Sequence, residues 1–356
     1  MLPPCSASSQ TRGLRNRVAN TVTNSPREAS FDVHGYRFSV HSSLEVPLEG
    51  LAQDFARFRS DARAPGVRIE LVDAEPPPDL LRATIPIAYT PRNVAYRHEG
   101  RRYVDYHGRG LGVRDEQTGD YRLYSRDPVL LYEAAYLYLL SQIGDALDRE
   151  GLHRIHALGV VVNGRAVLVL LPMGGGKSTL GLHLLQHPEV QLLSDDSPFI
   201  DRQGRLLAYP LRLGLLPGTE GGIPVEHRRT IDRMEFGPKH LVNYSYFASR
   251  VVASAEPGLV LIGSRALTND CRVEPISRLA AVRACLVNCV VGVGLFQGLE
   301  FLLQSTPWDL LGHAGIGASR LRNCLALIRR STVCRVQLGR DAALNARVVL
   351  EHARRL

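Results

Sequence analysis

The stretch Val167-Leu-Val-Leu-Leu-Pro-Met-Gly-Gly-Gly-Lys-Ser-Thr-Leu180 joins an apolar run to a glycine-rich turn and then to the start of a helix. Backbone N–H groups of such a turn and of a helix N-terminus bind anions, a lysine adds positive charge, and a Ser or Thr hydroxyl reaches Mg²⁺. The stretch therefore predicts a phosphate-binding loop in an α/β protein. It departs from the usual pattern G-x-x-x-x-G-K-[ST] at one position, where Leu171 replaces the first glycine.

Six consecutive residues are the predicted contacts to a nucleotide, with three glycines supplying backbone amides ahead of three polar side chains: Gly174, Gly175, Gly176, Lys177, Ser178 and Thr179. Leu171 lacks the freedom of glycine at positive φ, and Pro172 after it favours extended geometry. We therefore expect an ordinary backbone conformation at the entrance of the loop.

Two carboxylates follow the next predicted strand. Asp195 and Asp196 stand 17 and 18 residues after Ser178, a separation that one helix and one strand span. Carboxylates at a strand end converge on a neighbouring loop in α/β sheets, so we expect Ser178 and Asp195 to bind Mg²⁺ together. His156 precedes the loop, on the strand expected to lead into a hairpin at Asn163-Gly164.

Length and composition restrict the class of protein. The chain has 356 residues, 45% of them hydrophobic, which is enough for two domains. It contains no uncharged apolar run of 18 residues and no signal-peptide core, so we expect a cytoplasmic protein without a membrane span. The formal charge of +8 comes without an aromatic-interleaved basic stripe, so nucleic-acid binding is not expected. Six cysteines fit buried free thiols better than a zinc site.

The chain is predicted to have four parts, namely a disordered tail, a β-rich N-terminal domain, a connecting helix, and a P-loop domain with a helical C-terminal part, at residues 1–30, 31–126, 127–151 and 152–356. Glu99-Gly100 is the expected turn of a hairpin in the β-rich domain. Asp127 and Pro128 supply an N-cap and a first-turn proline to the connecting helix. Residues 280–308 fit either a core helix pair or a subunit contact.

The order of these features resembles the catalytic core of the HPr kinase/phosphorylase family, in which a histidine, a short hairpin, a P-loop and an Asp-Asp pair follow one another. The resemblance covers about residues 150–245 and implies an α/β fold with a P-loop kinase domain of the HPr kinase/phosphoenolpyruvate carboxykinase type. The chain differs from the family at Leu171, at Thr179, where HPr kinases have Glu, and at Arg212-Leu-Gly, where they have Arg-Gly-Leu-Gly. A Pro-Gly-Arg-Asn segment is also missing from the sequence, which suggests a substrate other than HPr.

The resemblance also implies roles for the candidate site residues. Asp196 would accept the proton of an attacking hydroxyl, and His156 would orient Asp196 or tune its basicity. Lys177 would neutralise the charge of the phosphates. Arg212 and Lys239 are candidates for stabilising the transferred group or docking the substrate, and a salt bridge elsewhere in the domain fits them equally well. ATP and Mg²⁺ are the expected cofactors.

The predicted function is an ATP-dependent kinase acting on a hydroxyl, with a serine of a protein or of a ribosomally made peptide as the expected acceptor. Two alternatives stay open: a small-molecule kinase, and a nucleotide-binding regulator that has lost catalysis, which the substitution at Leu171 suggests. Members of the family tend to oligomerise, and the resemblance leaves a homo-oligomer open for this chain.

Overall fold

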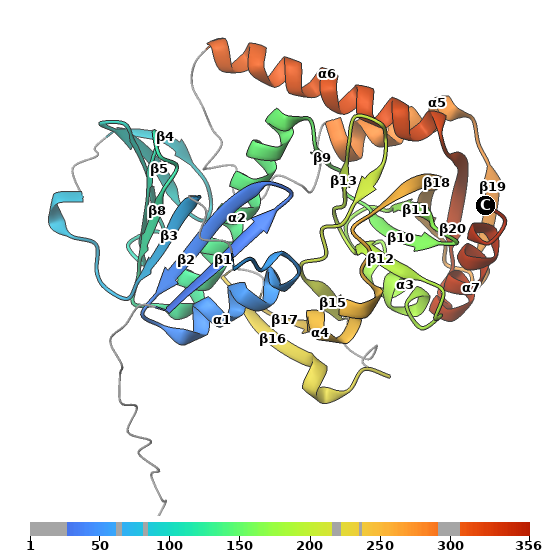
Figure 1. Cartoon of the computed structure of the whole chain (residues 1–356), viewed down its shortest axis with the longest axis horizontal. Helices are drawn as coiled ribbons and strands as arrows, with labels where there is room; N and C mark the ends of the chain where they lie inside the picture. The colour runs from blue at the N-terminus through green and yellow to red at the C-terminus, as the bar shows by residue number, and fades with distance from the viewer. Residues whose placement is uncertain (1–26, 62–65, 81–84, 216–221, 235–236, 291–306) are drawn as a thin grey trace, which may run out of the picture.

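The computed structural model describes residues 27–61, 66–80, 85–215, 222–234, 237–290 and 307–356. Over these ranges the chain is a mixed α/β protein with three sheets, of eight, nine and three strands. Figure 1 shows the eight-stranded sheet on one side, the nine-stranded sheet on the other, and helix α2 (Pro128–Glu150) between them. Most of the predicted N-terminal tail, residues 1–26, lies outside the described ranges.

The eight-stranded sheet, here the N-terminal sheet, has the order β1-β2-β3-β8-β7-β6-β5-β4. Its strands are β1 (Arg27–Val33), β2 (Tyr36–Ser42), β3 (Val67–Val72), β4 (Pro86–Tyr89), β5 (Val94–His98), β6 (Arg101–Asp105), β7 (Leu111–Asp115) and β8 (Tyr121–Tyr124). Strand β1 begins at Arg27, ahead of the boundary predicted at residue 31. The predicted hairpin is present between β5 and β6, where Glu99 and Gly100 have φ values of 47° and 71°.

Helix α2 begins and ends where the sequence predicts. The Asp127 side chain accepts hydrogen bonds from the amides of Val129 and Leu130, and Gly151 closes the helix in the left-handed conformation with φ 81°. An N-cap of this kind contributes about 1 kcal/mol. Because the cap and the terminal glycine are both local features, these helix ends could be predicted without knowledge of the fold.

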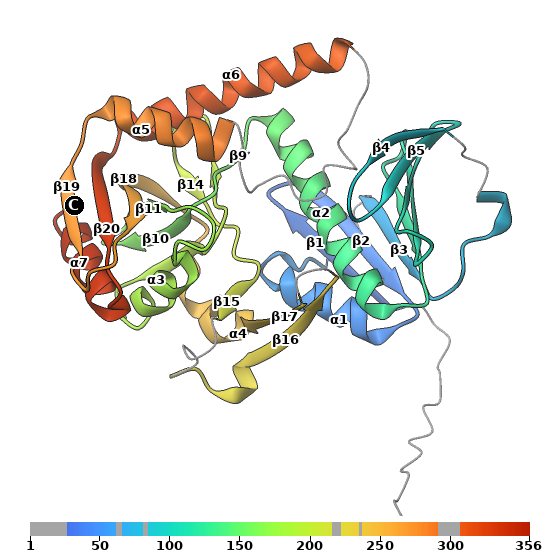
Figure 2. The same ribbon diagram turned by 180° about the vertical axis from the view of Figure 1, so that it is seen from behind.

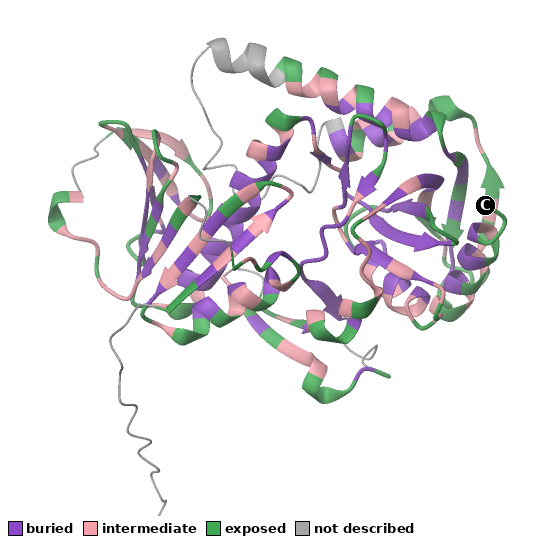
Figure 3. Cartoon of the chain, viewed as in Figure 1, coloured by how far each residue is buried: buried purple, intermediate pink, exposed green. Residues whose placement is uncertain are grey.

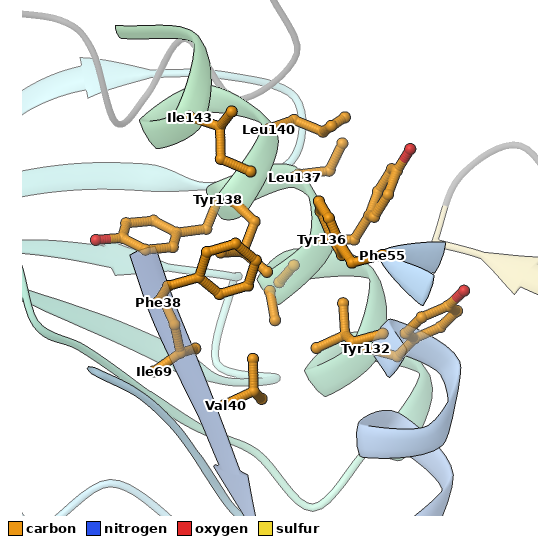
Figure 4. Close-up of a cluster of buried hydrophobic side chains, with 14 of the residues drawn as sticks. Phe38, Val40, Phe55, Ile69, Tyr132, Tyr136, Leu137, Tyr138, Leu140 and Ile143 are labelled. Atoms are coloured by element: carbon orange, nitrogen blue, oxygen red, sulfur yellow. The ribbon is translucent and has the colours of Figure 1, made fainter. Parts of the chain in front are cut away.

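The surroundings of α2 differ from the expectation of a single apolar face, since every residue from 130 to 144 is buried. Helix α1 (Glu45–Asp54) and the N-terminal sheet cover part of the helix, and the second half of the chain covers the rest. In Figure 4, Tyr138 lies close to Phe38, whereas Tyr136 lies beside Phe55 on another side of the helix. The helix is therefore a central element, shared by the cores of both halves.

The nine-stranded sheet, here the central sheet, has the order β12-β10-β11-β18-β14-β13-β9, with β20 pairing also with β18 and β19 with β20. Its strands are β9 (His153–Arg154), β10 (Leu158–Val162), β11 (Arg165–Leu170), β12 (Gln191–Ser194), β13 (Phe199–Ile200), β14 (Leu206–Leu207), β18 (Ser254–Arg265), β19 (Arg272–Pro275) and β20 (Thr332–Leu338). Strands β10 and β11 form the predicted hairpin, in which Asn163 and Gly164 have φ values of 52° and 73°. Strands β11, β18 and β20 run parallel.

Helices cover both faces of the central sheet, as Figure 2 shows. Helices α3 (Lys177–Leu184) and α7 (Ala342–Ala353) lie on one face, and α5 (Arg278–Cys285) and α6 (Pro307–Arg329) on the other. Along β11, Val167 and Val169 belong to the core on the α3 side, while Leu168 and Leu170 belong to the core on the α5 side. Because both faces of β11 are covered, its sequence is an unbroken apolar run. Figure 3 shows the strands of the central sheet buried between more exposed helices.

A small sheet of β15 (Leu213–Leu215), β16 (Arg228–Arg233) and β17 (Gly237–Val242), followed by α4 (Tyr244–Phe247), lies next to α2. Ile231 and Leu241 of this sheet, with Phe199 and Tyr209, belong to the same hydrophobic core as α1 and α2. The two halves of the chain are thus joined by continuous apolar packing.

Free thiols are found at Cys285, Cys289, Cys324 and Cys334, which are buried as predicted, and at Cys271, which is only half-buried. Cys5 lies outside the described residues. Of the segment 280–308, most of α5 and a π-helical turn at Leu286–Val290 are described, and residues 291–306 are not. None of the described helices combines the length and the apolar character of a membrane-spanning segment.

Candidate active site

The phosphate loop and the aspartate pair lie at the same edge of the central sheet. Strand β10 is antiparallel to both β11 and β12, so β11 and β12 run in the same direction and end at the same edge. The loop follows β11, and Asp195 and Asp196 directly follow Ser194, the last residue of β12. The convergence predicted from the spacing is therefore present.

The loop leaves backbone donors open at the start of α3. Gly174 and Gly176 have φ values of 72° and 93°, and Gly176 is the N-cap of α3, with no side chain bonded to the first-turn amides. A side chain at Gly175 would come within 2.8 Å of the Pro172 carbonyl oxygen, so this position also requires glycine. Since the first N–H groups of a helix have no intrahelical acceptor, this end of α3 suits an anion.

Leu171 fits the loop entrance because a neighbouring strand makes room for it. Its side chain is 2% exposed and belongs to the core beneath α3. Leu171 is not among the described non-glycine residues with positive φ, as the sequence predicted. A Cβ atom at Gly263 of β18 would lie 2.3 Å from Leu171 Cδ2. Leu171, which stands where the usual pattern has its first glycine, is thus accommodated by packing over Gly263.

Lys177 is held inside the loop. Its Nζ lies 2.9 Å from His156 Nε2 and donates to the carbonyl oxygens of Leu171 and Pro172 at 2.9 and 3.4 Å. With an ammonium as the donor, Nε2 is the acceptor and the imidazole proton lies on Nδ1. Burial lowers the pKa of Lys177, and the two nearby aspartates oppose this effect. A bound phosphate would favour the charged ammonium further.

Asp195 is a buried carboxylate with little compensation. It is 6% exposed, and its Oδ2 accepts a hydrogen bond of 3.4 Å from Ser178 Oγ. Burial, and then the charge of Asp196, raise the pKa of Asp195 to about 7, while Lys239 and Ser178 work in the opposite direction. A divalent cation beside Ser178 and Asp195 would offset this charge.

The donor set fits Mg²⁺ rather than a metal held by protein side chains alone. Among the described residues, no group of three His, Cys, Asp or Glu side chains could hold a metal ion. Mg²⁺ is usually bound through one or two carboxylates, with substrate phosphates and water completing the octahedron. Ser178 and Asp195 next to the phosphate loop match this arrangement.

Asp196 and His156 form a second pair, in which His156 Nδ1 lies 3.3 Å from Asp196 Oδ1. The contact has the distance of an ion pair, but it is not aligned as a hydrogen bond. Burial raises the pKa of Asp196, but His156, Lys177 and Lys239 outweigh it and lower the pKa overall. The Asp196 side chain is 51% exposed, so its ionised oxygen is accessible.

The position of His156 corrects the prediction that it lies on a strand. It lies in a bend between β9 and β10, and the amide of Ala157 donates to the Asp196 carbonyl oxygen at 2.9 Å. This backbone bond ties the bend to the chain after β12, which brings the imidazole to Asp196. Strand propensity alone could not separate such a bend from a continuous strand.

A cavity of about 480 Å³ opens at this edge, between the phosphate loop and α2. Its polar lining comes from both halves of the chain: Arg92, Glu133, Arg154, His156, Ser178, Asp195, Asp196, Arg212, Arg233 and Lys239. Its apolar lining includes Tyr136, Leu137, Leu140, Met173, Tyr209, Leu211 and Met234. The volume and the mixture of apolar walls with convergent polar groups are those of a ligand site.

The two predicted cations Arg212 and Lys239 are placed differently. Arg212 Nε donates to Asp54 Oδ2 at 2.8 Å, and its Nη1 lies 2.9 Å from Glu133 Oε1. Lys239 has no such fixed partner among the residues that the structure describes. It approaches Ser178 beside Gly214, with its Nζ 3.7 Å from where a Cβ atom at Gly214 would lie. Arg212 thus joins the two halves of the chain while lining the cavity, and its catalytic role stays a prediction.

Two arginines near the site were not singled out from the sequence. Arg265, at the end of β18, lies beside the loop, since its Nη1 would be 2.9 Å from a Cβ atom at Gly176. Arg154 lines the cavity from β9. Arg265 could only be found once β18 was known to neighbour β11, whereas Arg154 could have been found from its spacing of two residues from His156.

No protein-family model matches the chain, and no curated protein is similar enough in sequence to count as a relative. Among solved structures, the HPr(Ser) kinase/phosphatase from Coxiella burnetii is similar over 56% of this chain and 95% of that chain, at 15% sequence identity and a TM-score of 0.26. A TM-score this low does not define a common fold, so the function proposed next depends on the residues of the site.

Proposed function

We propose that this chain is an ATP-dependent kinase that transfers the γ-phosphoryl group to the hydroxyl of a serine in a protein or a ribosomally made peptide. The main support is the meeting, at one sheet edge beside one cavity, of five residues that are dispersed in the sequence: His156, Lys177, Ser178, Asp195 and Asp196. This is a site for phosphate, for a divalent cation and for proton transfer together.

The nucleotide would bind at the loop. The open amides at the start of α3 would hold its phosphates, and Lys177 would exchange its contacts with the Leu171 and Pro172 carbonyls for phosphate oxygens. Mg²⁺, held by Ser178 and Asp195, would supply positive charge to the phosphates. The ligand thereby meets the charge requirements of both buried groups, the ammonium of Lys177 and the carboxylate of Asp195.

The acceptor hydroxyl would lie in the cavity beside Asp196. Its oxygen forms a bond to the γ-phosphorus as the bond from that phosphorus to the β–γ bridging oxygen breaks, and ADP leaves. Asp196 takes the hydroxyl proton, since its lowered pKa keeps it ionised at neutral pH. His156, whose Nδ1 lies 3.3 Å from Asp196 Oδ1, would orient the Asp196 carboxylate.

The decisive experiment measures the transfer of labelled phosphate from ATP to serine peptides by the wild type and by Asp196→Asn. We expect the variant to lose about 10²- to 10⁴-fold in rate while binding ATP nearly as well, because only the proton acceptor is removed. Asp232→Asn, at an exposed position of β16, is the matched control and should keep full activity. Equal rates for wild type and Asp196→Asn would eliminate Asp196 as the base, and failure of the wild type to bind ATP would eliminate the kinase.

The chief alternative is a nucleotide-binding regulator without catalysis. Leu171 suggested it, but Leu171 has an ordinary backbone conformation and packs over Gly263, which favours the kinase. Tight ATP binding without transfer to serine peptides or to small hydroxyl compounds would favour the regulator.

A further inference from the structure

Arg154, at the end of β9, and His156, in the bend that follows, both line the cavity. Backbone hydrogen bonds of Ile155 and Ala157 join this segment to the chain that carries Asp196. The side chains of Ile155 and Ala157 belong to the core on the α5 side of the central sheet. Ile155 and Ala157 thus face the core, whereas Arg154 and His156 line the cavity.

A glycine in α2 gives the Arg154 guanidinium its place. A Cβ atom at Gly144 would lie 2.2 Å from Arg154 Nη2 and 2.8 Å from Arg154 Cζ. Gly144 is buried inside the helix, where glycine is a poor helix former. The absence of a side chain at position 144 lets the guanidinium lie directly against α2.

This guanidinium has no acidic partner among the described residues. Within the described parts of the chain Arg154 makes no hydrogen bond or ion pair through its guanidinium, although the residue is half-buried. Its chain neighbour His153, by contrast, contacts both Asp148 and Ser319. A partly desolvated cation without an anion is costly, so the site favours a negatively charged ligand.

Tyr209 adds a second unsatisfied group nearby. It lines the same cavity, and its buried hydroxyl has no hydrogen-bond partner among the residues that the structure describes. Burial raises the pKa of Tyr209, and the positive charge of Arg154 acts in the opposite direction. A buried hydroxyl and an unpaired guanidinium on one wall together provide donors for a carboxylate or a phosphate.

The order of the groups assigns this wall to the acceptor rather than to the nucleotide. Lys177, from the phosphate loop, contacts His156 on one side. Arg154, two residues before His156 in the chain, lies against Gly144 of α2. Asp196, the proposed base, contacts His156 through the other ring nitrogen, Nδ1. Because Asp196 and Arg154 line the same cavity, a molecule that fills it from Asp196 to α2 would reach Arg154.

We propose that the acceptor carries an anionic group next to its reacting hydroxyl and that Arg154 binds this group. The acceptor is then a peptide segment in which an Asp or Glu flanks the serine. Other cations on the cavity wall, Arg92, Arg233 and Lys239, give this surface the same preference. This inference rests on the kinase activity proposed above.

The test is the phosphorylation of a positional library of serine peptides with labelled ATP. We expect wild type to select Asp or Glu beside the serine. Arg154→Gln should lower the ratio of kcat/KM for an acidic peptide over its Asn/Gln counterpart by about 10- to 100-fold, the usual effect of losing a charged hydrogen bond. Arg154→Lys should restore part of this ratio, and the KM for ATP should stay the same. Arg335→Gln, which removes one exposed charge from β20, is the matched control.

Gly144→Ala serves as a second variant if Arg154→Gln does not fold. The added methyl group displaces the guanidinium without removing its charge, and alanine favours the helix, so this variant should lose acidic selectivity too. An active wild type without preference for acidic residues, or equal losses on acidic and neutral peptides in Arg154→Gln, would overturn the inference alone. Transfer to small hydroxy acids and to no peptide would also overturn it. A wild type that does not bind ATP would instead overturn the kinase itself.

Discussion

Two clusters of charged side chains lie beside the same cavity, and they differ in how completely they are paired. The interface cluster joins the two halves of the chain through Asp54, Glu133, Arg212 and Arg229. Asp54 is fully buried and accepts hydrogen bonds from Arg212 Nε at 2.8 Å, from the Tyr132 hydroxyl at 2.7 Å and from Arg229. Each carboxylate in this cluster thus faces at least one guanidinium.

The site cluster, formed by His156, Lys177, Ser178, Asp195 and Asp196, is paired only in part. Asp195 has a hydroxyl as its hydrogen-bonding partner, and burial raises its pKa to about 7. The ammonium of Lys177 is bound by an imidazole and two carbonyl oxygens, none of which carries a negative charge. Charges that are paired within the protein therefore stabilise the fold, whereas charges that lack such pairing suit a charged ligand.

Arg212→Met should produce the largest effect, because it breaks the interface cluster and leaves Asp54 and Glu133 buried without their shared partner. We expect the free energy of unfolding to fall by about 3–5 kcal/mol, measured by urea denaturation. Arg330→Met, which breaks an exposed ion pair with Glu256, is the control and should cost less than about 1 kcal/mol. Unchanged stability together with a large loss of kcat in Arg212→Met would assign Arg212 to catalysis instead, as the sequence suggested.

The comparison also explains what the sequence could predict. The loop, the Asn163-Gly164 hairpin and the ends of α2 are local features, specified by residues a few positions apart, and all three are found where they were expected. The edge shared by Lys177 and Asp195 followed from spacing alone, because one helix and one strand return the chain to the same edge.

The rest depended on contacts between distant residues. Arg212 lies next to Asp54, which is 158 positions away, and no local pattern connects them. The room for Leu171 comes from Gly263 on a strand whose place in the sheet could not be deduced from order along the chain. Burial of α2 on all sides likewise required knowing that both halves pack on it. Sequence patterns indicate which residues could act in the site. Contacts between distant residues determine which of these are already paired within the protein.

Leu171→Gly tests the packing at the loop entrance, since it restores the glycine of the usual pattern and removes the hydrophobic contact that this chain has there. We expect it to cost about 2–5 kcal/mol of stability, as for other buried Leu truncations. Adding Gly263→Ala should recover part of this loss, because the new methyl group fills space that Leu171 leaves. The measurement is again urea denaturation of the single and double variants. Higher stability or faster phosphoryl transfer in Leu171→Gly would contradict the role given to this contact.

Asp195→Asn is expected to have the smallest effect on stability, and this effect should be a gain rather than a loss. In the folded protein the pKa of Asp195 is raised from 3.8 to about 7, so the folded state holds its proton more tightly than the unfolded state. The stabilising contribution is therefore complete below about pH 4 and is lost as the pH rises through 7. Replacing the carboxylate by an amide removes this loss.

Thermal melting without metal should then give Asp195→Asn a Tm roughly 2 °C or more above wild type at pH 8, with little difference at pH 4. The variant should lack the further stabilisation that we expect Mg²⁺ and ATP to give wild type, because the buried charge that destabilises the free protein is the one proposed to bind the cation. Asp232→Asn, exposed on β16, should melt like wild type at both pH values. If wild type and Asp195→Asn show the same pH dependence, the carboxylate is already compensated within the protein, and the two clusters no longer differ in pairing.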